Sequence, residues 1–148
     1  MASLKEQLSG GETRGKVITD ACGVLDQEVA DKGGLTGIAI KGAYKIVQGV
    51  KPGFIREAVD GLLDDFLTAL DPIYQEAAQK KRPIGAFLRE NASRVADALL
   101  AITDSRATRA SGVVRGAYDK LRPMAKKQVE AAAPRLGDLL GRHAASTA

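Results

Sequence analysis

Most of the chain consists of segments in which apolar residues recur every three or four positions, which is the period of an α-helix. The clearest segment follows Gly53, where a broad apolar face is formed by Phe54, Ile55, Ala58, Val59, Leu62, Leu63, Phe66, Leu67 and Leu70. No stretch alternates between apolar and polar residues with turn signals on both sides, as a half-buried strand would. The pattern therefore predicts an all-α fold.

Glycines and prolines divide this pattern into a bundle of about six to seven helices. A capping-box sequence, SLKE, predicts a short opening helix that ends at the glycine pair 10–11. We expect helices to end at Pro52 and Pro123, to begin at Pro72 and Pro83, and to break at Asp104 and Pro134. Residues 1–141 are predicted to form a single domain, and residues 142–148 a flexible tail.

One sequence segment occurs twice. GIAIKGAYKIV at residues 37–47 returns as GVVRGAYDKL at residues 112–121, and each copy precedes a proline and another helix. An offset of 74 residues relates the two copies, which is half of the 148-residue chain. This predicts two related helical triplets, in halves 13–74 and 83–141, packed about a pseudo-twofold axis.

The glycines of this repeat lie within predicted helices, where each costs about 0.5 to 1 kcal/mol relative to alanine. Leu35, Ile38, Gly42, Ile46 and Val50 form one stripe, which we expect to be buried. Close packing of another helix against a notch of small residues would compensate for the glycines. The predicted notches comprise Gly37, Gly42, Ala43, Tyr44, Gly112, Gly116, Ala117 and Tyr118. The alternative is a small apolar or phosphate-bearing ligand in a notch, near Lys41 or Arg115.

The two halves of the chain have opposite charge. Residues 1–74 hold 8 basic and 11 acidic residues, a net charge of −3, whereas residues 75–148 hold 14 and 7, a net charge of +7. The residues predicted to contact an anionic partner are Arg106, Arg109, Arg115, Arg122, Lys126 and Lys127. That partner would be nucleic acid or an anionic membrane surface. Alternatively, the basic surface is simply solvated, or docks on the acidic face between Glu57 and Asp65, within the chain or across a homodimer.

The sequence offers little catalytic chemistry. Its only histidine, His143, lies in the predicted tail, and its only cysteine, Cys22, lies on an apolar stripe. Glu57, Asp60 and Asp64 share a helical face that we expect to be solvated. We therefore predict no catalytic residues, no bound metal and no cofactor.

The most apolar long window, residues 35–55, contains three lysines and a proline, so no transmembrane segment is expected. The N-terminus lacks a signal-peptide pattern, and the single cysteine cannot form an intramolecular disulfide, so a cytoplasmic protein is predicted.

Three functional classes follow, in order of preference. The first is a non-enzymatic interaction or scaffold protein with a protein partner or self-association. The second is a binder of nucleic acid or an anionic membrane through the basic half. The third is a carrier of a small apolar ligand within the bundle.

Overall fold

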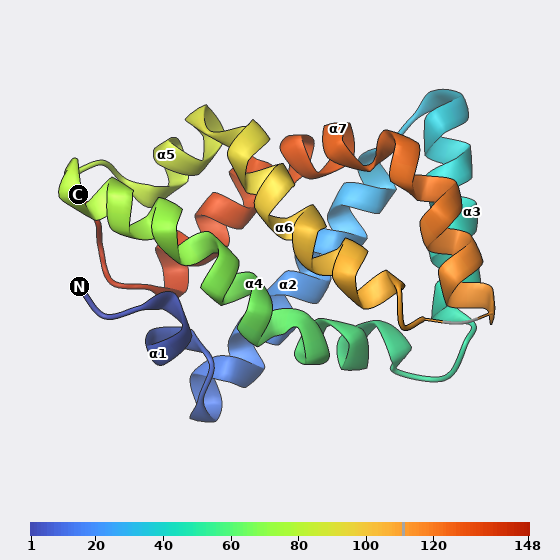
Figure 1. Cartoon of the computed structure of the whole chain (residues 1–148), viewed down its shortest axis with the longest axis horizontal. Helices are drawn as coiled ribbons and strands as arrows, with labels where there is room; N and C mark the ends of the chain where they lie inside the picture. Colours follow the sequence, from blue (N-terminus) through green and yellow to red (C-terminus); the bar gives the residue numbers. More distant parts are fainter. Residues whose placement is uncertain (111) are drawn as a thin grey trace.

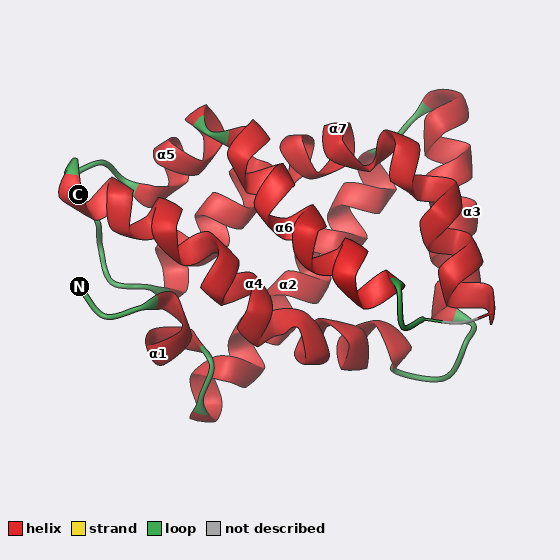
Figure 2. Ribbon diagram, in the orientation of Figure 1, coloured by secondary structure: helices red, strands yellow, loops and turns green. Residues whose placement is uncertain are grey.

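The computed structural model describes residues 1–110 and 112–148, and within them it contains seven α-helices and no strand (Figure 2). The helices are α1 (Leu4–Leu8), α2 (Gly11–Asp31), α3 (Gly34–Gln48), α4 (Phe54–Gln79), α5 (Ile84–Glu90), α6 (Ala92–Ala107) and α7 (Gly112–His143). The all-α prediction is confirmed. Two short helices, α1 and α5, lie at one end of the bundle, and α3 lies at the opposite end (Figure 1).

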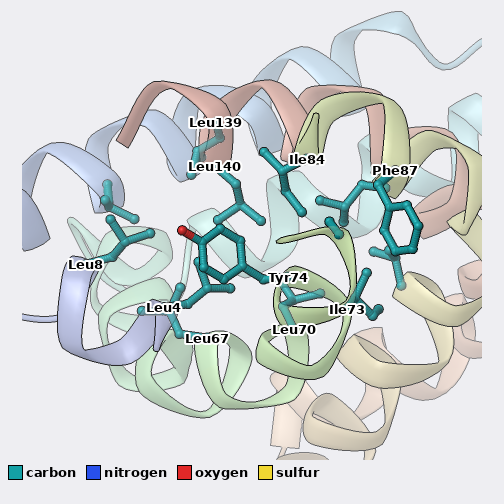
Figure 3. Packing of buried hydrophobic residues seen from close by; sticks show 14 of the residues in the cluster. Leu4, Leu8, Leu67, Leu70, Ile73, Tyr74, Ile84, Phe87, Leu139 and Leu140 are labelled. Atoms are coloured by element: carbon teal, nitrogen blue, oxygen red, sulfur yellow. The ribbon is translucent and has the colours of Figure 1, made fainter. Parts of the chain in front are cut away.

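The hydrophobic core is densest at the end that holds α1 and α5. Tyr74 is fully buried there, and leucines and isoleucines from α1, α4, α5 and α7 surround it (Figure 3). Its hydroxyl donates to the carbonyl oxygen of Ala145 at 2.7 Å and accepts from the Gln7 side-chain amide at 3.1 Å. The buried Tyr74 hydroxyl therefore has both an acceptor, near the C-terminus, and a donor, near the N-terminus.

Helix α4 continues through Pro72, so the predicted new helix at Asp71 and Pro72 is wrong. The carboxylate of Asp71 does not cap its own helix. Instead it accepts a hydrogen bond from the backbone N–H of Leu4 at 2.9 Å, which satisfies one of the free donors at the start of α1. Proline costs α4 one backbone hydrogen bond, and burial of the apolar residues on both sides of it stabilises the longer helix.

The region after Pro83 also differs from its prediction. The single expected helix is divided at Asn91, whose side-chain amide donates to the Phe87 carbonyl oxygen at 2.8 Å. The expected break at Asp104 is absent, and α6 continues to Ala107. The carboxylate of Asp104 accepts hydrogen bonds from Tyr118 and Arg122, so it does not compete for backbone N–H groups of its own helix.

Helix α7 runs through both Pro123 and Pro134, although each was expected to end or interrupt a helix. Figure 1 shows α7 changing direction along its length, as is expected where proline removes a backbone donor. It contacts α2, α3, α5 and α6. Packing against four helices stabilises α7 where local propensity alone would end it.

The two Gly-Ala-Tyr segments lie side by side, because α3 packs against α7 and runs in the opposite direction (Figure 1). The helices around them are not equivalent. In the first copy, residues 49–53 separate α3 from α4, whereas in the second copy the corresponding helices are fused into α7. The pseudo-twofold arrangement stays a prediction.

The chain end is packed against the bundle, in contrast to the predicted flexible tail. Thr147 is buried, and its hydroxyl donates to the carbonyl oxygen of Arg82 at 2.5 Å. His143 belongs to the last turn of α7, where its Nε2 lies 2.6 Å from the Asp20 carboxylate. This hydrogen bond is the main reason why the pKa of Asp20 is lowered.

Candidate ligand cavity

A cavity of about 350 Å³, partly open to solvent, lies between α2, α4 and α7. Helix α3 contributes Ile40 to its wall and α6 contributes Leu99. From α2 and α4 the wall takes Val17, Ala21, Val24, Leu25, Val29, Val59, Leu63, Phe66, Leu67 and Leu70. From α7 it takes Leu121, Met124, Ala125, Val129, Ala132, Leu136, Leu139 and Leu140. The volume falls within the usual range for small-molecule sites, about 300 to 1,000 Å³.

Three polar residues contribute to the wall. Of the described residues that line the cavity, only Glu28, Lys32 and Gln128 have polar side chains, and they contribute almost no polar surface to it. Glu28 is 8% exposed, and its Oε1 lies 3.2 Å from Nζ of Lys32. An ammonium group has three donors, so Lys32 retains donors beyond the one directed at Glu28.

Arg135 of α7 completes this charged cluster. Its guanidinium donates to Glu28 through Nη1 and to Asp31 through Nη2, the latter at 2.5 Å. The Arg135 guanidinium holds the pKa of Asp31 below its usual range. The cluster joins the end of α2 to α7 and contains two positive and two negative side chains. The cluster therefore has no net charge, and it has little attraction for a free ion beside the apolar cavity.

The basic residues predicted to bind an anion lie away from this cavity, and four of the six are paired with carboxylates. Arg106 contacts Asp65 at 2.6 Å, Arg115 contacts Asp119 at 3.1 Å, Arg122 contacts Asp104 at 2.8 Å, and Lys126 contacts Asp97 at 3.0 Å. Arg109 and Lys127 have no carboxylate within ion-pair distance in the described part of the chain. A phosphate ligand would have to compete with these internal acceptors.

The expected close helix packing at Gly42 and Gly116 is wrong. Both glycines are exposed, and a Cβ on either would meet no atom within 4 Å. The stripe itself also faces outward, because Leu35, Ile38, Ile46 and Val50 are exposed. The buried positions of α3 are Gly37, Ile40 and Ala43. The sequence spacing gives this helix an apolar stripe on each of two sides. Packing against α7 buries the stripe that contains Ile40 and Ala43.

The other notch residues have local roles. A Cβ on Gly37 would lie 2.7 Å from the carbonyl of Lys32, so this glycine allows the tight turn between α2 and α3. Gly112 begins α7 with a φ of +56°, which favours glycine. Ala117 is half-buried. The hydroxyls of Tyr44 and Tyr118 donate to Asp26 and Asp104, so each tyrosine fastens its helix to the preceding one.

Close helix crossing occurs at glycines outside the predicted notches. A Cβ on Gly137 of α7 would lie 2.9 Å from the Cα of Gly85 in α5 and 3.0 Å from its carbonyl oxygen. Both residues are in helices, and Gly137 is buried. The crossing lies beside the core end rather than at the Gly-Ala-Tyr segments.

Other reactive groups are dispersed. Burial raises the pKa of the Cys22 thiol, which disfavours the nucleophilic thiolate. Asp60 and Asp64 both contact Arg14, and Glu57 contacts Lys51, so these acidic residues form surface ion pairs. Among residues 1–110 and 112–148, no three His, Cys, Asp or Glu side chains gather in a metal-binding arrangement. None of the helices described has the length and apolarity required to cross a membrane.

Comparison with known proteins gives one match. Residues 4–144 match the model of a family of unknown function, DUF6918, and the chain belongs to this family. No curated protein and no solved structure shows a significant match. The matched range includes all seven helices described above and ends one residue after α7, so the cavity lies entirely within the matched region.

The sequence did carry a signal for the cavity. Leu121, Ala125, Val129, Ala132 and Leu136 recur at steps of three and four along α7, and all line the cavity. Pro123 and Pro134 divide this stripe, so it was not interpreted as one helical face. The charged cluster had no such signal, because Arg135 is 107 positions from Glu28.

Proposed function

We propose that this protein is a non-enzymatic carrier that binds a small, predominantly apolar ligand in the cavity between α2, α4 and α7. The observation that supports this most strongly is the cavity itself, whose wall is apolar over nearly all of its described residues. Binding an apolar ligand would restore the contacts that the wall residues otherwise lack.

The apolar surface of the cavity supports the same proposal. Because the cavity is partly open to solvent, its apolar wall can contact water when no ligand is bound. Burial of this surface by an apolar ligand is favourable and would couple binding to stability.

The composition of the wall indicates the kind of ligand. Glu28, Lys32 and Gln128 line the cavity with the apolar parts of their side chains, because almost none of the cavity surface is polar. A predominantly apolar chain or ring system would be buried among leucines and valines. A mostly apolar wall is typical of small-molecule sites.

The experiment is displacement of N-phenyl-1-naphthylamine, a neutral apolar dye, together with native mass spectrometry of the purified protein. Ala132 lines the cavity, whereas its neighbour Ala131 is exposed. We expect Ala132→Trp to weaken dye binding at least tenfold and Ala131→Trp to leave it unchanged. Equal dye affinity in both variants, or absence of binding by the wild-type chain, would refute the carrier proposal.

The other two functional classes have less support. Binding of an anionic polymer would require Arg106, Arg115, Arg122 and Lys126 to exchange their carboxylate partners for phosphates. For a scaffold role, the exposed apolar face of α3 is the surface that the described residues offer to a partner. Self-association and a cytoplasmic location stay predictions.

A further inference from the structure

Helix α3 presents an apolar face to solvent. Leu35 is 87% exposed, Ile38 is 69% exposed and Ile46 is 56% exposed, with Gly42 between them on the same side. Single exposed apolar residues are common on proteins, but a contiguous row along one helix marks an interaction surface. We define these four residues as the α3 outer face.

The apolar surface extends beyond α3. Val113, in the first turn of α7, is 55% exposed, and Val50 follows the end of α3 at 42% exposure. Because α7 packs beside α3, these exposed apolar residues gather at one end of the molecule (Figure 1). The opposite end holds α1 and the buried core, so the two ends differ in character.

The charged side chains of α3 itself are all positive. Residues 34–48 contain Lys41 and Lys45 and no acidic residue. Both lysines are exposed, and neither has a carboxylate within ion-pair distance among the residues described. At 3.6 residues per turn, both lie on one flank of the apolar row. An apolar row with lysines beside it is typical of helices that lie in the interface of an anionic membrane.

We propose that the α3 outer face docks on the surface of a bilayer containing anionic lipid. The charge distribution favours this occupant over a second copy of the chain. A second copy would supply another face with two lysines and no carboxylate, whereas anionic headgroups supply the missing counter-charge. Apolar side chains would enter the headgroup boundary while the lysines contact lipid phosphates.

The position of α3 relates this surface to the cavity. Ile40, on the buried side of α3, lines the cavity, and Lys32 lines it just before the helix begins. Docking would therefore place the membrane against the helix that covers one part of the cavity. The inference goes beyond the carrier proposal and does not depend on it, because vesicle binding is measured without reference to cavity occupancy.

The experiment is co-sedimentation of the full chain with phosphatidylcholine vesicles that contain either no or 30 mol% phosphatidylglycerol. We expect strong binding only to the anionic vesicles. Leu35→Ser/Ile38→Ser/Ile46→Ser should lower the partition coefficient at least tenfold. Lys41→Glu/Lys45→Glu should lower the partition coefficient at least about 25-fold, because each lysine near an anionic surface contributes about fivefold.

A matched control is available in Lys5 and Lys16, which are exposed residues of α1 and α2 without ion pairs in the described structure. Lys5→Glu/Lys16→Glu changes the net charge by the same amount, and we expect it to retain binding within about threefold. Thermal unfolding of each variant checks that it is folded. The serine changes are at exposed sites, so their midpoints should stay close to wild type.

A tryptophan reporter gives a second readout, because the chain has no tryptophan. Ile38→Trp should shift its emission to the blue on addition of anionic vesicles, whereas Ala2→Trp, at the opposite end, should not. Absence of binding to anionic vesicles would overturn the proposal. An equal loss of vesicle binding in the Lys5→Glu/Lys16→Glu control would also overturn it. So would a wild-type chain that does not bind vesicles but forms a dimer, if the triple serine variant abolishes that dimer.

Discussion

The hydroxyl of Tyr118 in α7 donates a hydrogen bond to the carboxylate of Asp104 in α6. Arg122, one turn further along α7, donates to the same carboxylate at 2.8 Å. The pKa of Asp104 is therefore lowered, first by Arg122 and then by Tyr118, while burial and this carboxylate raise the pKa of Tyr118. Tyr44 and Asp26 repeat the contact between α3 and α2.

Removing either tyrosine hydroxyl should loosen the corresponding helix pair. We expect Tyr118→Phe to lower the free energy of unfolding by about 1 kcal/mol, because Asp104 keeps Arg122 as a partner. Tyr44→Phe leaves Asp26 without this donor and should cost at least as much. Urea denaturation of the two variants measures both values. A Tyr118→Phe cost far above that of Tyr44→Phe would contradict the comparison.

A side chain at Gly137 should lower the stability of the fold. Gly137→Ala places a Cβ within 3.0 Å of the Gly85 backbone, so α5 and α7 must separate, and we expect a loss of about 1 to 3 kcal/mol. The control is Gly116→Ala in the same helix, where the added Cβ meets no atom within 4 Å. It should raise stability by about 0.4 to 1 kcal/mol. Thermal or urea unfolding compares the two, and equal effects would contradict the crossing.

Asp71 should stabilise α1 from a distance in sequence. Asp71→Ala removes the acceptor for the Leu4 N–H and should cost about 1 kcal/mol, as loss of other helix caps does. Asp71→Asn keeps a side-chain acceptor and should cost less. Because Leu4 and Leu8 are fully buried, loosening of α1 should also raise hydrogen exchange around Tyr74. Unchanged exchange in Asp71→Ala would refute this coupling.

Acid should destabilise the fold through its paired carboxylates. Hydrogen bonds from His143, Arg135, Arg14 and Arg122 lower the pKa values of Asp20, Asp31, Asp64 and Asp104, respectively. A lowered folded-state pKa contributes stability that is present above the unfolded value, near 3.9, and lost as pH falls through the folded value. Urea unfolding between pH 5 and 2 should therefore show a steady decline below about pH 4.

Asp104→Asn is the control for this pH dependence. The amide does not titrate, so the variant should be less stable at pH 5 and should lose less stability on acidification than the wild type. An identical decline in both proteins would show that Asp104 contributes nothing to it.

Ligand removal provides the remaining prediction. If the chain is purified with cavity ligand, extraction of that ligand should lower the thermal midpoint, because a ligand that binds only the folded state stabilises it. Adding an apolar ligand back should restore the midpoint in wild type and in Ala131→Trp, and much less in Ala132→Trp, whose cavity is already partly filled. Full restoration in Ala132→Trp would place the ligand elsewhere.

The all-α class could be predicted from periodicity alone, because apolar residues recur every three or four positions in almost every segment. Boundaries at proline were predicted correctly at Pro52, which follows α3, and at Pro83, which precedes α5, but not at the other three prolines. Pro72, Pro123 and Pro134 all lie inside helices, since burial against other helices outweighs one lost backbone hydrogen bond. That information depends on neighbours distant in sequence.

The candidate site was only partly accessible from the sequence. An apolar-ligand carrier was among the expected functions, but the notch residues Gly42 and Gly116 suggested a different location for close contact. On α3, apolar residues occur on both sides, so the pattern did not reveal that Ile40 faces inward while Ile38 faces solvent. The choice depends on where α7 packs.

The position of α7 also constrains the order of folding. Its residues form one wall of the cavity and contact four other helices, so residues 1–110 alone lack part of the core. During synthesis, which proceeds from the N-terminus, the face of α2 that packs against α7 stays uncovered until α7 emerges. The cavity wall is completed in the same step, so a ligand present in that interval can bind while the last wall forms.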